Sequence, residues 1–192
     1  MQMKKIPTLF ERKFAPGKDA EITDKVHPGM EWVLDGKGEA TVKWDGSCCA
    51  IIDGQFYKRY DAKRGKKPPA GAIPCCDPDP VTGHHPHWVL VDKDKPENRW
   101  FINAFINASA IWPMCDGTYE AIGPAFNGNP YGLDENILRP HGVDVLRNCP
   151  RSFEGIREYL SMNLIEGIVF WNGTEPQCKI RRKDFGFKWP MK

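Results

Sequence analysis

Short β-prone runs of mostly apolar residues follow one another between residues 39 and 60. Residues 39–43, 48–52 and 55–60 are rich in β-branched, aromatic or other apolar side chains, and Asp-Gly pairs separate them at 45–46 and 53–54. Asp-Gly between such runs is a strong signal for a β-hairpin. The pattern therefore predicts an antiparallel meander over this region.

The rest of the chain carries both helix and strand signals. Residues 99–111 have the length and apolar content of a helix, and residues 152–162 repeat apolar positions at helical spacing behind a capping Ser152. Further strands are expected at residues 88–91, 117–122, 167–171 and 177–182, with Asn172-Gly173 as the turn of the last pair. The Gly-, Pro- and Lys-rich residues 64–83 predict a long loop. Together these signals predict an α+β fold dominated by antiparallel sheet.

Length and composition limit the classes of protein to consider. A chain of 192 residues can bury one good core, so we expect a single domain over residues 1–192. No apolar run approaches the roughly 20 residues that span a membrane, and no signal-peptide core is evident at the start. We therefore expect a cytoplasmic protein. Because 27 basic residues nearly balance 25 acidic ones, any nucleic-acid surface must be a local patch.

Seven cysteines, four of them in two adjacent pairs, form a poor framework for disulfides. Reduced thiols are the simpler interpretation. One cluster contains residue types that can bind zinc: Cys75, Cys76, His84, His85 and His87. Their spacing fits no standard zinc finger, so we favour a loop whose histidines face solvent or touch a ligand.

Lys43 is the best candidate for a nucleophile, because it ends a β-rich run directly before a tight Asp-Gly segment. A lysine amine attacks only when it is neutral, and burial or neighbouring cations favour that form. Such cations occur near the C-terminus, where Lys179, Arg181 and Lys183 alternate with other residues and would share one strand face.

Four short motifs appear in a fixed order: Lys43-Trp44-Asp45-Gly46, Tyr119-Glu120-Ala121-Ile122-Gly123, Glu166-Gly167-Ile168-Val169 and Lys179-Ile180-Arg181. This set resembles motifs I, III, IV and V of the covalent nucleotidyltransferases, which include ATP-dependent ligases and mRNA capping enzymes. Within that superfamily the chain looks most like a group of small 5′-to-3′ RNA ligases, through stretches such as residues 57–63, 79–84, 128–133 and 140–142. The resemblance implies a nucleotidyltransferase (adenylation) domain without an OB domain.

The resemblance also implies an activity. In such ligases the motif I lysine, here Lys43, attacks the α-phosphorus of ATP and becomes linked to AMP. AMP then passes to an RNA 5′-phosphate, and an RNA 3′-hydroxyl displaces it to form the phosphodiester. Catalysis of this kind depends on positioning, cations and Mg²⁺, with Mn²⁺ as a possible substitute.

By the same motif match, Lys179 and Arg181 would hold the α-phosphate and Glu166 would bind Mg²⁺. Glu120 would bind the ribose, and Asp45 would fix the turn beside the nucleophile. Three more residues complete the expected nucleotide site: Val42, Arg59 and Arg64. Of the two arginines, Arg59 lies in the better-matched segment and is favoured as the phosphate contact.

A groove of basic residues would bind the phosphates of RNA. It comprises Arg59, Lys63, Arg64, Lys66, Lys67, Arg182, Lys183 and Lys188.

Each assignment has a plainer alternative. Lys43 could be a solvated surface lysine, Glu120 and Glu166 could be structural, and the basic strand could be a charged sheet edge. Asn129 and His141 could touch the ligand or only stabilise their loops.

Three functions therefore stay open. The first is an ATP-dependent RNA ligase. The second is a non-catalytic module that binds nucleotide or nucleic acid, and the third is another nucleotidyl transfer, such as DNA nick sealing or protein adenylylation.

Overall fold

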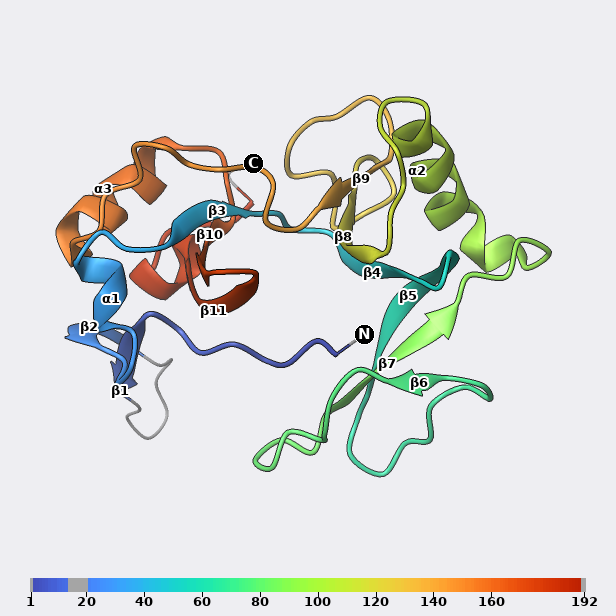
Figure 1. Cartoon of the computed structure of the whole chain (residues 1–192), viewed down its shortest axis with the longest axis horizontal. Helices are drawn as coiled ribbons and strands as arrows, with labels where there is room; N and C mark the ends of the chain where they lie inside the picture. The colour runs from blue at the N-terminus through green and yellow to red at the C-terminus, as the bar shows by residue number, and fades with distance from the viewer. Residues whose placement is uncertain (1, 14–20, 191–192) are drawn as a thin grey trace. The chain divides into compact units, whose positions relative to one another are not determined.

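The computed structural model describes residues 2–13 and 21–190, and it shows an α+β chain rich in antiparallel sheet (Figure 1). Its contacts divide the chain into two compact units. Unit 1 comprises Asp45–His141 with the described part of Met1–Lys5, and unit 2 comprises the described parts of Ile6–Trp44 and Gly142–Lys192. That the whole chain acts as one nucleotidyltransferase domain stays a prediction.

Unit 1 is built on a six-stranded antiparallel sheet with the order β6-β7-β5-β4-β8-β9. The strands are β4 (Ser47–Ile52), β5 (Gln55–Ala62), β6 (Ile73–Pro74), β7 (His85–Leu90), β8 (Gly117–Ile122) and β9 (Ile137–Pro140). The short 3₁₀ helix η1 (Pro96–Asn98) leads into α2 (Arg99–Ser109), which lies beside β8 and β9 (Figure 1). Ala104 and Ala108 of α2 are buried against one face of this sheet.

The other face of the six-stranded sheet has its own small core. Ala50, Tyr57, Cys75 and Trp88 are buried there, and Met3 of the N-terminal segment packs against them. Because side chains alternate along a strand, residues two positions away lie on the same face, such as Cys48 and Ile52 on either side of Ala50.

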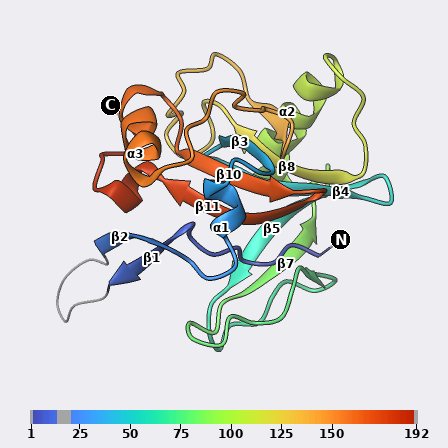
Figure 2. The same cartoon turned by 60° about the vertical axis from the view of Figure 1, so that its left-hand side comes forward.

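Unit 2 contains a three-stranded antiparallel sheet with β10 in the middle, between β3 and β11 (Figure 2). The elements of the unit are β1 (Phe10–Lys13), β2 (Glu21–Val26), α1 (Glu31–Leu34), β3 (Glu39–Lys43), α3 (Phe153–Met162), β10 (Gly167–Asn172), β11 (Glu175–Arg181) and the 3₁₀ helix η2 (Arg182–Phe185). Ile168, Phe170 and Ile180 of the sheet are fully buried with Ile156 and Leu160 of α3. The apolar face of the sheet is thus covered, and the polar side chains lie on its other face.

Most elements expected from the sequence are present. The helices at 99–111 and 152–162 and the strands at 117–122, 167–171 and 177–182 are confirmed within a few residues. Ser152 caps α3 as expected, because its hydroxyl accepts a hydrogen bond from the Gly155 amide at 3.2 Å. Asp53 and Gly54 join β4 to β5 with φ values of 51° and 70°, as a two-residue hairpin turn requires.

The meander over residues 39–60 is wrong at its first turn. β3 and β4 do not pair, because β3 joins the sheet of unit 2 and β4 joins the sheet of unit 1. Asp45-Gly46 is therefore a passage from one unit to the other. A local turn signal could not reveal this, since the partner of β3 lies more than a hundred residues later in the chain.

Other elements escaped the sequence analysis. Strands β1, β2 and β9 and helix α1 had no clear periodic signal, and the long loop contains the two-residue β6. Lys183 lies in η2, so it does not continue the strand face of Lys179 and Arg181 as expected. None of the helices in the described part of the chain is long and apolar enough to cross a membrane.

Candidate active site

Lys43 is the last residue of β3, and its amine forms an ion pair with Glu166, which directly precedes β10. Lys43 Nζ donates a hydrogen bond to Glu166 Oε2. The register of β3 and β10 explains this ion pair, because Lys43 lies opposite Gly167, the residue after Glu166. The two side chains are only 24% and 10% exposed, so Lys43 is not a solvated surface lysine.

Lys179 and Arg181 of β11 lie on the same sheet face as Lys43. Lys43, Gly167 and Arg181 form one row across the three strands, and Lys179 belongs to the next row. Their neighbours on β11 point into the core. With strands about 4.8 Å apart, two strand spacings put the backbones of Lys43 and Arg181 about 10 Å from each other.

Gly167 lets the middle and outer strands approach closely. A Cβ atom at this position would lie 2.2 Å from the Ile180 carbonyl oxygen and 2.9 Å from Arg181 Cα. Any other residue here would have to push β11 away. Gly167 of β10 therefore sets the distance between β3, which carries Lys43, and β11, which carries Arg181.

Asp184 holds the guanidinium of Arg181. Its carboxylate accepts hydrogen bonds from Arg181 Nη2 at 2.9 Å, Arg181 Nε at 3.2 Å and the Arg181 amide at 2.9 Å. It also pairs with Arg12, and its side chain is only 4% exposed. Sequence reasoning missed both Asp184 and Arg12, because neither belongs to a motif and Arg12 lies far away in the chain.

The outer edge of β11 is occupied. Leu9 donates its amide to the Lys179 carbonyl at 2.8 Å, and the Lys179 amide donates to the Pro7 carbonyl at 3.0 Å. The basic strand is therefore not an open sheet edge. Val42 points to the face opposite Lys43, since it pairs with buried Ile168, so any role of Val42 in nucleotide binding stays a prediction.

In unit 1, the segment after the nucleophile is anchored by the loop that follows β8. The Asp45 amide donates to Tyr131 Oη at 2.6 Å, and Asn127 Nδ2 donates to Asp45 Oδ1 at 2.8 Å and to the Gly46 carbonyl at 2.9 Å. Tyr131 and Asn127 thus hold Asp45 in place, while its expected role beside the nucleophile stays a prediction. A Cβ on Gly46 would lie 2.0 Å from the Ala121 carbonyl oxygen, so only glycine fits there.

Glu120 of β8 supports the same segment. Its Oε1 accepts a hydrogen bond from the Gly46 amide at 3.0 Å, and its Oε2 lies 3.1 Å from His141 Nε2. His141 Nδ1 in turn lies 2.9 Å from Thr118 Oγ1. The Glu120 carboxylate is therefore held in place, while its expected contact with ribose stays a prediction.

Arg59 and Glu120 share one face of the six-stranded sheet. The register places Arg59 and Glu120 on either side of Cys48 in one row, although Arg59 is also paired with Asp61 at 2.8 Å. Burial raises the pKa of the Cys48 thiol, which stays neutral between them.

Arg64 lies in the exposed loop after β5, where its Nη2 donates to the Val81 carbonyl at 3.1 Å. Of the two arginines, Arg59 lies on the sheet face that carries Glu120. That Arg59 contacts phosphate stays a prediction.

Arg182 does not fit the RNA groove expected from the sequence. It is buried, and its guanidinium donates hydrogen bonds to the carbonyls of Leu160, Asn163 and Lys188. The arginine thus completes the C-terminal end of α3. Asn129 likewise forms a turn, since its side-chain amide bonds Leu133 in both directions at 2.8 and 2.9 Å.

The cysteine and histidine cluster shows no metal geometry. Cys75 and His87 are buried, and His87 Nδ1 donates to the His85 carbonyl at 2.8 Å. Within residues 2–13 and 21–190, no three His, Cys, Asp or Glu side chains are grouped to hold a metal ion. The zinc interpretation therefore finds no support in this part of the chain.

Comparison with known proteins agrees with the motifs. A family model for RNA ligase 1 matches residues 105–192. RNA ligase 1 of Rattus norvegicus is 29% identical over 226 residues, covering 79% of this chain and 68% of the rat protein. The Mus musculus protein of the same name is 28% identical with the same coverage. The chain is thus similar to RNA ligase 1 proteins, as a distant relative.

The RNA ligase 1 family model and the site overlap in part. The matched residues contain Glu120, Glu166, Lys179 and Arg181, whereas Lys43 precedes them. RNA ligase 1 of Danio rerio is 30% identical over 139 residues, covering 57% of this chain and 43% of that protein. This similarity agrees with the resemblance to RNA ligases that the sequence motifs carry.

Proposed function

We propose that the chain is an ATP-dependent RNA ligase that forms a covalent lysyl-AMP at Lys43. Similarity to RNA ligase 1 supports a ligase acting on RNA. The observation that carries the proposal is the sheet of β3, β10 and β11, which groups Lys43, Glu166, Lys179 and Arg181 on one face. A lysine, a carboxylate and two cations are the groups that phosphoryl transfer to an amine needs.

In the first step, Lys43 Nζ attacks the α-phosphorus of ATP. The N–P bond forms, the bond from the α-phosphorus to the pyrophosphate oxygen breaks, and the amine gives up a proton. An ion-paired ammonium has no free electron pair, so this proton must leave before the attack. Glu166 Oε2, which already accepts a hydrogen bond from Lys43 Nζ, would take this proton and pass it to solvent.

Lys179 and Arg181 have the task of stabilising the negative charge on the phosphoryl oxygens. Their charges act most strongly where water is excluded. Arg181 is suited to a phosphate because a guanidinium offers two parallel donors. Its present partner Asp184 fixes its orientation from behind the strand end.

Glu166 is a single carboxylate, so it could supply only part of the ligands of a magnesium ion. It offers one carboxylate of a hard oxygen type, and Mg²⁺ commonly combines one or two carboxylates with substrate phosphates and water. Glu166 together with the phosphates of ATP would hold the ion, which supplies positive charge to the oxygens of the reacting phosphate.

The second and third steps use RNA. The 5′-phosphate of RNA displaces Lys43 from the α-phosphorus, which regenerates the amine. A 3′-hydroxyl then attacks the RNA phosphorus, a phosphodiester forms, and AMP leaves. Lys179 and Arg181 would serve all three steps, because each moves charge onto phosphoryl oxygens.

The proposal is tested by mass. Three proteins are incubated with Mg²⁺ and ATP, and their intact masses are then measured: wild type, Lys43→Ala and Lys37→Ala. Lys37→Ala is the control, because it removes an exposed lysine of the same unit. We expect one added AMP in wild type and Lys37→Ala and none in Lys43→Ala. A nucleotide-binding module without catalysis would bind ATP with no adduct.

A second assay identifies the nucleic acid. Nicked RNA, nicked DNA and single-stranded RNA with a 5′-phosphate and a 3′-hydroxyl are offered to the adenylated protein. Sealing of RNA and not of DNA is the expected result. Preferred sealing of nicked DNA would refute an RNA ligase.

A further inference from the structure

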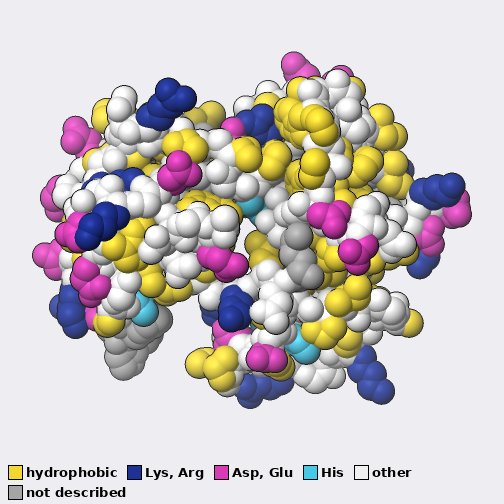
Figure 3. All heavy atoms as spheres, viewed as in Figure 1, with side chains coloured by type: hydrophobic (Ala, Val, Ile, Leu, Met, Phe, Trp, Pro, Cys, Tyr) yellow, Lys and Arg dark blue, Asp and Glu magenta, His cyan; other side chains and the backbone are white. Residues whose placement is uncertain are grey.

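A cluster of cations occupies the loop between β5 and β6, outside the site described above. Lys63, Arg64, Lys66 and Lys67 are exposed, and in the part of the chain that the structure describes no carboxylate pairs with the three lysines. Figure 3 shows Lys and Arg side chains along the lower rim of this unit, where the loop lies in Figure 1. Uncompensated positive charge of this density suits a polyanion.

The loop is held against the segment that leads into β7. Ala62 pairs with His85 in the sheet, Arg64 donates to the Val81 carbonyl, and a Cβ on Gly83 would collide with the Arg64 side chain. The segment before β7 therefore lies beside the loop cations. Lys63 directly follows Ala62, which pairs with His85.

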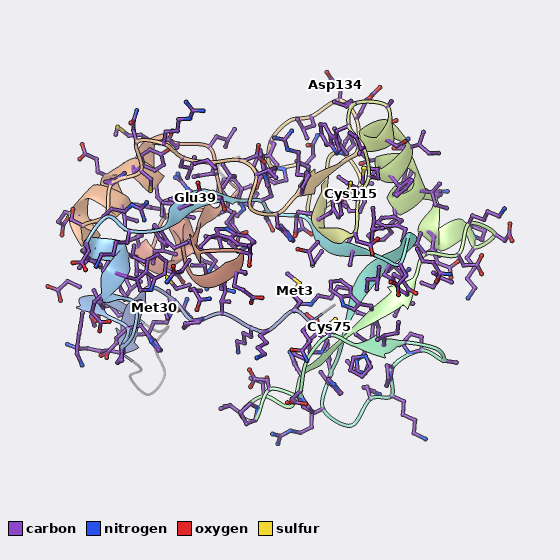
Figure 4. The ribbon with its side chains drawn as sticks, viewed as in Figure 1. Met3, Met30, Glu39, Cys75, Cys115 and Asp134 are labelled. Atoms are coloured by element: carbon purple, nitrogen blue, oxygen red, sulfur yellow. The ribbon has the colours of Figure 1, made fainter. Side chains whose placement is uncertain are left out.

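The N-terminal segment closes the other side and leaves a pocket. The Met3 amide donates to the Cys75 carbonyl at 2.9 Å, and the two residues lie side by side in Figure 4. Lys5 pairs with Asp79 at 2.7 Å. Between these anchors is a pocket of about 370 Å³, whose lining includes Lys4, His85 and Asp77.

An aromatic ring adjoins this surface. Tyr60 is 40% exposed and lies opposite His87 in the sheet, and the ring of His87 is 4.2 Å from that of His85. Proteins that bind single-stranded nucleic acid combine such aromatic platforms with cations that follow the backbone. An acidic protein surface would need the cations but would have no use for an exposed stacking ring.

We propose that this surface binds a single-stranded segment of the RNA substrate. Lys63, Lys66 and Lys67 contact its phosphates, a base stacks on Tyr60, and the pocket beside Lys4 takes a neighbouring nucleotide. The proposal rests on the proposed RNA ligase function and adds where the RNA lies. It assigns RNA binding to unit 1 residues that take no part in forming the lysyl-AMP.

The test compares two triple variants. The first is Lys63→Ala/Lys66→Ala/Lys67→Ala. The second removes the same charge from exposed positions elsewhere: Lys37→Ala/Lys93→Ala/Lys95→Ala. Binding of a fluorescent, 5′-phosphorylated 12-nucleotide RNA is followed by anisotropy across a salt series, and adduct formation is measured separately by intact mass.

The expected effect follows from counterion release. Each phosphate contact on a single strand contributes about 0.7 to the slope of log affinity against log salt. Losing three contacts reduces the magnitude of the slope by about 2. If variant and wild type bind equally at about 1 M salt, the variant should therefore bind about 50-fold more weakly than wild type at about 0.15 M. Tyr60→Ala should weaken binding about tenfold with an unchanged slope.

The outcomes separate the two proposals. Weakened RNA binding and sealing with normal adduct formation in the loop variant, and normal binding in the control variant, support the RNA surface. RNA binding at wild-type strength in the loop variant overturns it. Equal loss in both triple variants also overturns it. Absence of an adduct in wild type refutes the ligase, and the anisotropy data still decide the RNA surface.

Discussion

Replacing Gly167 with alanine should move β11, which carries Arg181, away from β3, which carries Lys43. The new Cβ would lie 2.2 Å from the Ile180 carbonyl oxygen, whereas an ordinary contact begins at 3.4 Å. The clash involves backbone atoms, so β11 must move by about 1.2 Å to relieve it. Arg181 lies opposite Gly167 and moves with β11, while Lys43 stays on the other neighbour of β10.

The expected result is a large kinetic loss with a moderate loss of stability. A misplacement of about 1 Å in a reacting site can cost about 100-fold in rate. Overpacking of this kind costs about 1–3 kcal/mol in the free energy of unfolding, which a typical domain tolerates. We therefore expect a folded Gly167→Ala protein whose adenylation at saturating ATP is about 100-fold slower.

The assay is single-turnover formation of lysyl-AMP, followed by quenching and intact mass. Gly117→Ala is the matched control, because its Cβ would meet nothing nearer than 3.7 Å and it also begins a strand. The control should react like wild type. A folded Gly167→Ala protein that adenylates within threefold of wild type would show that the spacing of β10 and β11 does not position the reacting groups.

Three further predictions concern groups that hold the site or the core. Asp184→Asn should raise the KM for ATP more than it lowers kcat, because Arg181 loses the carboxylate that orients it; an unchanged KM in steady-state adenylation would contradict this. Arg182→Met should lower the free energy of unfolding by about 2 kcal/mol, since buried carbonyls at the end of α3 lose their donor, whereas Lys183→Ala should not. Burial raises the pKa of Cys178 to about 12 from an ordinary value of 9.0, so only the unfolded thiol ionises between these values and stability falls as pH rises above 9. Urea unfolding at pH 8 and pH 10 should therefore show a smaller loss in Cys178→Ala than in wild type, and equal losses would count against the explanation.

The sequence was most informative where local pattern and tertiary structure agree. The alternation of Lys179 and Arg181 with Cys178 and Ile180 predicted a strand with one polar face, and the Asn172-Gly173 pair predicted its hairpin. Four ordered motifs also predicted that Lys43, Glu166 and the basic strand belong together, although nothing in their spacing gave the contact.

The features that were missed depend on partners distant in sequence. Asp45-Gly46 has the composition of a hairpin turn, yet Glu120, Asn127 and Tyr131 hold it as a passage between units. In the sequence nothing distinguishes Asp184 from other acidic residues, and its role follows only from its ion pair with Arg181. Arg182 belongs by charge to a basic surface, and only the end of α3 explains its burial.

The two-residue period of β11 limits how this chain can change in evolution. Loss or gain of a single residue within the strand would exchange its faces, putting Lys179 and Arg181 into the apolar core and Cys178 and Ile180 on the face of Lys43. Length variation should therefore be confined to the bend around Gly173, where added atoms meet open space. Sequences related to this one should therefore show no single-residue insertion or deletion within Glu175–Arg181.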